Sequence, residues 1–198
     1  MYIDDKLNWT KHVNYYCEKL SKMSGMFSKL RHICDLKLLK TIYFALVESH
    51  LQYCNIIWGN ASESVLEPLS KLQGKILRII CFLPNDLGNT VLAQTQTKLL
   101  NIEQLNKLSV AKFMFKFKNK KLPKCFENFF RARPEQQRYS LRSRVNEDFI
   151  REWGKSDYGM KRLQYEGVQL WNSIAAEIRN SKSLREFKNK FKSYLLDF

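Results

Sequence analysis

Apolar residues recur along the chain at steps of three and four residues, which is typical of amphipathic helices. The clearest stripe begins at Trp9 and alternates these two steps. It consists of Trp9, Val13, Tyr16, Leu20, Met23, Phe27 and Leu30. The pattern predicts one long helix, with Asp5 or Asn8 as the residue that caps its start.

Two further helices are expected before residue 85. Asp35 is a suitable N-cap for the first, and Gly59-Asn60 predicts where that segment stops. Its expected apolar positions are Leu38, Leu39, Ile42, Tyr43, Leu46, Val47 and Leu51. The next helix should begin at Ser62 or Ser64 and end before Pro84. Its expected buried residues are Leu66, Leu69, Leu72, Ile76, Leu77 and Ile80.

The second half of the chain continues the helical pattern less evenly. Residues 89–100 are ambiguous, and a fourth helix is expected from Ile102 to about Asn119. Its inward residues should be Leu105, Leu108, Ala111 and Phe115. A short helix is expected around Val168–Ile178, and Ser183 with Glu186 has the spacing of a capping box before a last helix. Phe187, Phe191, Tyr194 and Leu195 should be its buried residues.

This reading predicts a mainly α fold in three parts. Residues 1–122 form a helical, thumb-like bundle, 123–157 a basic loop or hinge, and 158–198 a small C-terminal helical unit. No apolar run approaches the roughly 20 residues that span a bilayer, and the start is acidic where a signal peptide is basic. We therefore expect no membrane partner and an intracellular location, cytoplasmic or nuclear.

Positive charge is concentrated in the second half of the chain. The net charge is +15, and residues 101–198 carry 22 of the 34 Lys and Arg. Because such a block attracts polyanions, nucleic acid is the expected partner, although the same charges can form only a solvated face. The candidate binding residues are Lys112, Lys116, Lys118, Lys120, Lys121, Lys124, Arg131, Arg133, Arg138, Arg142 and Arg144, with a smaller cluster of Lys29, Arg31, Lys37 and Lys40.

Aromatic residues interleave with these charges. Phe113, Phe117 and Tyr139 have the position to stack on exposed bases, but their periodicity favours packing in the core. Trp58 and Trp171 are expected to be buried, each with its indole N–H satisfied.

No catalytic set or metal site is predicted. Tyr2-Ile3-Asp4-Asp5 matches the Tyr-x-Asp-Asp box of reverse transcriptases, but two-metal chemistry needs that box on a β-hairpin beside a further aspartate. Here it leads directly into a helix, so the ordinary reading is charge at a helix N-terminus. Five cysteines without a CxxC pair indicate thiols in the core, and His32 with Cys34 or His50 with Cys54 lack the partner pair that zinc needs.

Several blocks of sequence carry a resemblance. The two longest read ALVESHLQYCNIIWGN, from Ala45 to Asn60, and YEGVQLWN, from Tyr165 to Asn172. The others are Ile3-Asp4 with Leu7, Trp9, His12 and Val13; Lys71-Leu72-Gln73 with Arg78-Ile79-Ile80; and Ser183-Leu184 with Phe187-Lys188. In this order they resemble the C-terminal part of reverse transcriptases from non-LTR, LINE-type and jockey-like retrotransposons.

The resemblance implies a post-catalytic segment of an RNA-directed DNA polymerase, in which the helices after the palm act as a thumb. It implies RNA or an RNA–DNA hybrid as partner, a palm domain as neighbour in a full-length parent, and no activity of its own. Magnesium is expected only in that parent, so we expect no cofactor and no small-molecule substrate here. A segment that normally packs on a palm should expose an apolar patch.

Two other readings remain open. The chain can be a degenerate helical interaction module without specific nucleic-acid function. It can also be an enzyme whose site has no recognisable motif, although no pair of perturbed titratable groups is indicated.

Overall fold

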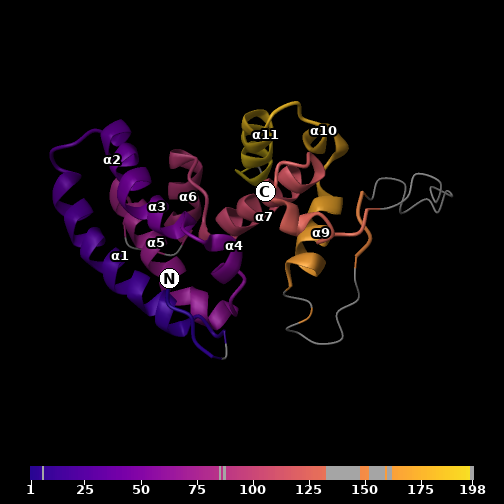
Figure 1. Cartoon of the computed structure of the whole chain (residues 1–198). Helices are drawn as coiled ribbons and strands as arrows, with labels where there is room; N and C mark the ends of the chain where they lie inside the picture. The colour runs from indigo at the N-terminus through magenta and orange to yellow at the C-terminus, as the bar shows by residue number, and fades with distance from the viewer. Residues whose placement is uncertain are drawn as a thin grey trace. The chain divides into compact units, whose positions relative to one another are not determined.

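The computed structural model describes residues 1–5, 7–84, 86, 88–132, 148–151, 159 and 162–196, and these are mainly α-helical (Figure 1). The chain divides into two compact units, Met1–Asn106 (unit 1) and Lys107–Asp197 (unit 2). The boundary lies inside helix α7 (Ile102–Lys118), whereas the sequence placed the end of the first domain at residue 122.

Unit 1 is built around two long helices that lie side by side, α1 (Thr10–Leu30) and α5 (Glu63–Ile80), as Figure 1 shows. Helix α6 (Gly88–Thr97), which occupies the ambiguous segment, packs against α5. Their shared core contains Val13, Leu20, Phe27, Leu69, Ile76 and Ile80. The predicted apolar stripes are therefore confirmed, except that Met23 and Leu30 of α1 and Leu66 and Leu72 of α5 are only half-buried.

The start of α1 differs from the prediction. Neither Asp5 nor Asn8 caps the helix, because the N-cap is Trp9, in a left-handed conformation with φ 63° and without a side-chain cap. Asp4 Oδ1 instead accepts a hydrogen bond from the Asn8 backbone N–H at 2.8 Å. The Trp9 side chain at this position is buried, with 8% exposed.

The second predicted helix begins as expected but changes its winding. Asp35 caps α2 (Leu36–Tyr43) by accepting from the Leu38 N–H at 2.8 Å. The chain then forms a π-helical turn, η1 (Phe44–Glu48), and continues as α3 (Ser49–Gln52).

This π turn explains which apolar residues are buried. The fully buried residues are Leu39, Tyr43, Val47 and Leu51, each four positions after the last. In a regular α-helix a four-residue step rotates the stripe by about 40°, and the wider π turn counters that drift. Leu38 and Leu46, which the sequence placed on the stripe, are 47% and 37% exposed.

Buried polar groups fix the remaining elements of unit 1. Gln73 donates to the Tyr43 hydroxyl at 2.8 Å and to the Leu100 carbonyl at 2.9 Å. Asn106 Nδ2 donates to the carbonyl of Asn55, which opens the short helix α4 (Asn55–Trp58). A Cβ on Gly59 would lie 2.5 Å from Asn106 Nδ2, so this close approach requires glycine.

Unit 2 packs the end of α7 against α9 (Leu163–Ser173) and α11 (Leu184–Leu196). Gly167 of α9 lies so close to α7 that a Cβ would be 3.4 Å from Met114 Sδ. Phe115 of α7 stacks on Phe187 of α11, with ring centroids 4.6 Å apart. The inward residues predicted for α7, Leu105, Leu108, Ala111 and Phe115, are all buried.

The predicted capping box precedes α11, with one difference. Ser183 Oγ accepts from the Glu186 N–H at 3.1 Å, as expected. The Glu186 carboxylate reaches back to the N–H of Lys182, at 3.0 Å, and not to that of Ser183. Between α9 and α11 lies the single turn of α10 (Ala176–Arg179).

Left-handed backbone conformations occur only at non-glycine residues in the described part of the chain. They are Leu7, Trp9, Cys54, Phe82, Lys98 and Lys120. The last three follow the ends of α5, α6 and α7, where a glycine is common.

Candidate nucleic-acid interface

The end of α7 presents lysines through a defined helix-terminating motif. Lys120, with φ 53°, donates its N–H to the Phe117 carbonyl at 2.9 Å, and the Lys121 N–H bonds to the Lys116 carbonyl at 2.8 Å. This pair of bonds is the Schellman arrangement. Lysines are favourable at this position because the C-terminal end of a helix carries partial negative charge.

Four of the predicted binding residues lie in and just after this motif and are exposed. They form no ion pair with any residue that the structure describes. We call Lys116, Lys120, Lys121 and Lys124 the α7-end lysines. Three of them fall within six residues of chain, and Lys124 opens the short 3₁₀ turn η2 (Lys124–Phe126).

The other predicted residues of this region are placed differently. Lys112 is half-buried and Arg131 is exposed, and both interact with other groups of the protein. Lys118 is held in an ion pair, described next. Arg133, Arg138, Arg142, Arg144 and Tyr139 lie outside the described residues.

Asp148 forms a polar centre that sequence reasoning missed. Its Oδ2 accepts from Trp171 Nε1 at 2.9 Å and from Lys118 Nζ at 3.0 Å, and it lies 3.1 Å from Arg179 Nη1. Burial would raise the pKa of the Asp148 carboxyl, but the Trp171 and Lys118 hydrogen bonds and the charge of Arg179 hold it below its usual value. Asp148 is therefore an anion at neutral pH, and it faces two cations, Lys118 and Arg179.

Aromatic rings pack behind the α7-end lysines. Phe113 contacts Phe126 edge to face at 5.3 Å between centroids, and Phe117 contacts Phe130 at 4.8 Å. Phe149 joins this group and is paired through its backbone with Ala132 in an isolated antiparallel bridge. The predicted packing role of Phe113 and Phe117 is confirmed, although both rings remain partly exposed.

A pocket of about 770 Å³ opens among these side chains. Four phenylalanines, three lysines and two acids are among its lining residues: Phe117, Phe126, Phe130, Phe149, Lys118, Lys120, Lys124, Glu127 and Asp148. The volume lies within the range of small-ligand sites, which is about 300–1,000 Å³. The lining thus combines aromatic rings with lysine side chains.

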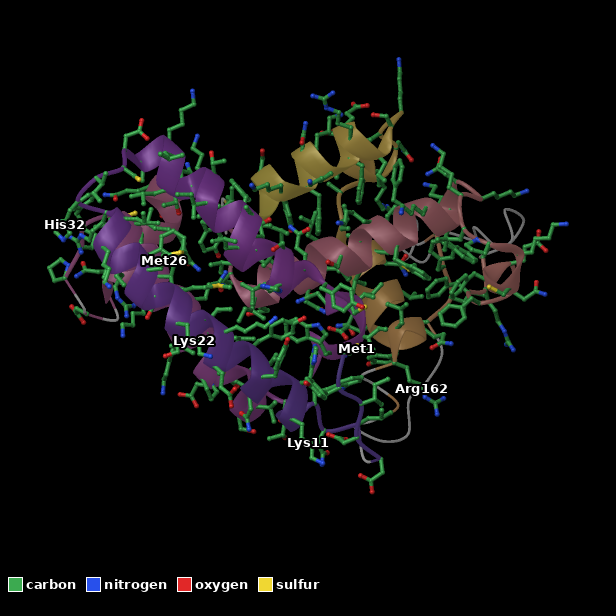
Figure 2. The ribbon with its side chains drawn as sticks, turned by 60° about the vertical axis from the view of Figure 1, so that its left-hand side comes forward. Met1, Lys11, Lys22, Met26, His32 and Arg162 are labelled. Carbon is green, nitrogen blue, oxygen red and sulfur yellow. The ribbon has the colours of Figure 1, made fainter. Side chains whose placement is uncertain are left out.

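The smaller predicted cluster lies in unit 1, where α1 ends and α2 begins. Figure 2 shows His32 at this end of α1 and Lys11 at the other. Lys29 and Lys37 are exposed, whereas Lys40 is half-buried. Arg31 stacks over the Phe82 ring at 4.5 Å, so its side chain is engaged in packing.

Apolar side chains are exposed near the same elements. Ile33 is 84% exposed and Phe82 51%, and Val91 and Leu92 of α6 are 68% and 45% exposed. Individually exposed apolar residues are normal on a protein surface, and only a contiguous patch would mark a contact surface.

In the described part of the chain, neither the Tyr-x-Asp-Asp box nor any group of His, Cys, Asp and Glu side chains has the geometry of a metal site. The Tyr-x-Asp-Asp box lies in an irregular segment without a β-hairpin, and Asp4 is engaged with Asn8. Within the described part of the chain, no three His, Cys, Asp or Glu side chains lie close enough to hold a metal ion. Among the helices that the structure describes, none is long and apolar enough to cross a membrane.

The two longest blocks of the resemblance have a common structural feature. Trp58 belongs to the first block and Trp171 to the second, and both side chains are fully buried. Trp58 Nε1 donates to the Tyr53 carbonyl at 2.8 Å, and Trp171 Nε1 donates to Asp148. Both indole predictions are confirmed, so each block contributes a buried tryptophan to the core of its unit.

Comparison with known proteins gives no relative. No family model, no curated protein and no solved structure matches the chain.

Proposed function

We propose that this protein binds the phosphate backbone of RNA or of an RNA–DNA hybrid through the α7-end lysines. The observation that carries the proposal is the exposure of these four cations, which have no acidic partner among the described residues. Each cation that neutralises a phosphate releases condensed counterions, and this release drives association. Lys118 differs from these four lysines, because its ammonium group is held by the Asp148 carboxylate.

The biological setting that fits this binding is the post-catalytic part of a non-LTR retrotransposon reverse transcriptase. The resemblance of the sequence blocks supports it, in particular ALVESHLQYCNIIWGN and YEGVQLWN. In such a parent, helices after the palm hold the template and primer. The segment would then contribute grip and no catalytic residue, and magnesium would belong to the palm.

The test is a binding titration with labelled RNA–DNA hybrid, single-stranded RNA and duplex DNA over a series of salt concentrations. One variant carries Lys116, Lys120, Lys121 and Lys124 changed to Gln. The control variant changes four other exposed lysines to Gln: Lys11, Lys22, Lys75 and Lys188. Lys11 and Lys22 are labelled on α1 in Figure 2. Both variants lose the same charge.

The α7-end variant is expected to lower the slope of log K against log salt by about 3, since each phosphate contact contributes about 0.7–0.9. The control should retain most of the original slope. Equal losses in the two variants would mean that binding follows net charge and not this site. Absence of binding near physiological salt would favour the interaction-module reading.

A further inference from the structure

The pocket beside the α7-end lysines has a more specific chemistry than a charged surface. Its apolar lining includes four aromatic rings from four segments: Phe117 from α7, Phe126 from η2, and Phe130 and Phe149 from the two segments that the β-bridge joins. Phe117 and Phe126 are partly exposed, whereas Phe130 and Phe149 are buried behind them in the lining. All the described lining residues belong to unit 2.

The lysines that line the pocket differ in their pairing. Lys118 lies 3.0 Å from Asp148 and shares that carboxylate with Arg179. Lys120 and Lys124 are exposed and have no ion pair with described residues. An occupant is therefore expected to combine an apolar or aromatic body with a negative group that meets these two lysines.

The pocket lining also contains side chains that can form hydrogen bonds with the polar edge of a planar ligand. The carboxylate of Glu127 accepts hydrogen bonds, and the amide of Asn128 both donates and accepts them. Both side chains are exposed, so they can meet a ligand without a rearrangement of the core. A planar ring with donors and acceptors at its edge suits these groups better than an aliphatic side chain does.

We propose that this pocket takes one unpaired nucleobase of a single-stranded segment while Lys120 and Lys124 hold the adjoining phosphates. The proposal rests on the proposed backbone binding and adds a preference for strand state. Aromatic side chains bind unstacked bases of any sequence, because every base has a π-face. A base within a duplex must first leave its stack and its partner, which opposes entry.

The test compares a thymidine octamer with an octamer of the same sugars and phosphates that lacks all bases. Both carry the same charge, so a difference in affinity reports contacts with the bases. We expect the intact octamer to bind about tenfold more tightly or better. The two octamers should share the same salt slope, since their phosphate contacts are the same.

A variant that fills the pocket without changing charge isolates its role. Ala132 lines the pocket, is exposed, and contributes its backbone to the bridge with Phe149. Ala132→Phe should remove the advantage of the intact octamer and leave binding of the abasic octamer unchanged. The matched control is Ala175→Phe, which adds the same side chain at an exposed alanine outside the pocket lining.

A second variant tests the pocket independently, in case Ala132→Phe disturbs the fold. Phe126→Leu keeps an apolar side chain in η2 but removes the ring, and should lower the advantage of the intact octamer. Circular dichroism of both variants checks that the helices are retained.

The outcomes separate the two proposals. Equal affinity of the two octamers for the unchanged protein, with a salt slope that depends on the α7-end lysines, would overturn the base pocket and keep the backbone site. Equal loss of both octamers in Ala132→Phe, with the helices retained, would also overturn the base pocket. If neither octamer nor hybrid binds at low salt, the proposed function itself fails.

Discussion

Unit 1 buries mainly aliphatic side chains from regularly spaced helices, whereas unit 2 gathers aromatic rings beside one carboxylate. In unit 1, Leu20, Leu51 and Ile76 are fully buried, the contacts of buried Gln73 are between neutral groups, and buried Arg78 donates to the neutral Thr90 hydroxyl. In unit 2, Phe115, Phe187 and Trp171 pack in series, and Asp148 joins α7 to α9 and α10. The stability of unit 2 should therefore respond to charge far more than that of unit 1.

The largest expected effect comes from Asp148→Ala. The change leaves Arg179, which is 4% exposed, and Lys118 without their shared carboxylate, and it leaves the Trp171 N–H without its acceptor. The expected loss is about 3 kcal/mol, at the low end for broken buried pairs because Asp148 is partly exposed. Hydrogen exchange should show lost protection in α9–α11 and little change in α1–α5.

The matched control for Asp148 is Glu67→Ala in unit 1. Glu67 pairs with Lys71 at 2.7 Å, but both side chains are more than half exposed. The expected loss is only about 0.3–0.5 kcal/mol. Similar losses for the two variants, or equal loss of protection in both units after Asp148→Ala, would break the comparison.

A smaller effect is expected from the two helix caps. Asp35→Ala removes the acceptor for the Leu38 N–H in unit 1, and Ser183→Ala removes the acceptor for the Glu186 N–H in unit 2. Each should cost about 1 kcal/mol, because a cap acts locally. Denaturant unfolding followed with hydrogen exchange should locate each loss in its own unit. Asp35→Asn and Ser183→Thr retain an acceptor and should lose little.

The most gradual effect is expected on acidification, because the two units should lose stability at different pH values. Burial lowers the pKa of His12 below its usual value, with a further contribution from the N-terminal amine, and burial also lowers that of His50. The unfolded chain therefore takes up protons first, and unit 1 should lose stability as pH falls below about 6.5.

Unit 2 should respond only at lower pH. The folded pKa of Asp148 is depressed, so its stabilising contribution is complete above the unfolded value and disappears as pH falls below about 4. Hydrogen exchange at pH 7, 5 and 3.5, corrected for the intrinsic exchange rate, is the measurement. His12→Gln should weaken the response of unit 1, and Asp148→Asn that of unit 2. A simultaneous response of both units would contradict the assignment.

The sequence predicts the structure of unit 1 more completely than that of unit 2. The helices of unit 1 follow the apolar spacing, and Asp35 marks a start through its own side chain. The π turn at Phe44–Glu48 was not predicted, since the alternatives Leu38 and Leu46 are as apolar as the buried Leu39 and Val47. Trp9 was not recognised as N-cap because its side chain makes no capping hydrogen bond.

In unit 2 the Asp148 centre could not be predicted from spacing. Its partners Lys118, Trp171 and Arg179 lie 23 to 31 residues away, on elements whose packing is set by aromatic contacts. Lys118 therefore looked like one more cation of a basic run. The nearest available signal was the expectation that a buried indole N–H needs an acceptor, but it names no particular residue.

The left-handed residues at helix ends have a consequence for protein engineering. Phe82, Lys98 and Lys120 adopt a conformation that glycine accepts without steric cost, whereas the described glycines occupy other conformations. Lys98→Gly is thus a place to seek a more stable variant without altering the α7-end lysines. The same replacement at Lys120 would relax the backbone but remove a cation from the lining of the pocket. At that position, stability of the fold and binding of an anionic ligand therefore favour different residues.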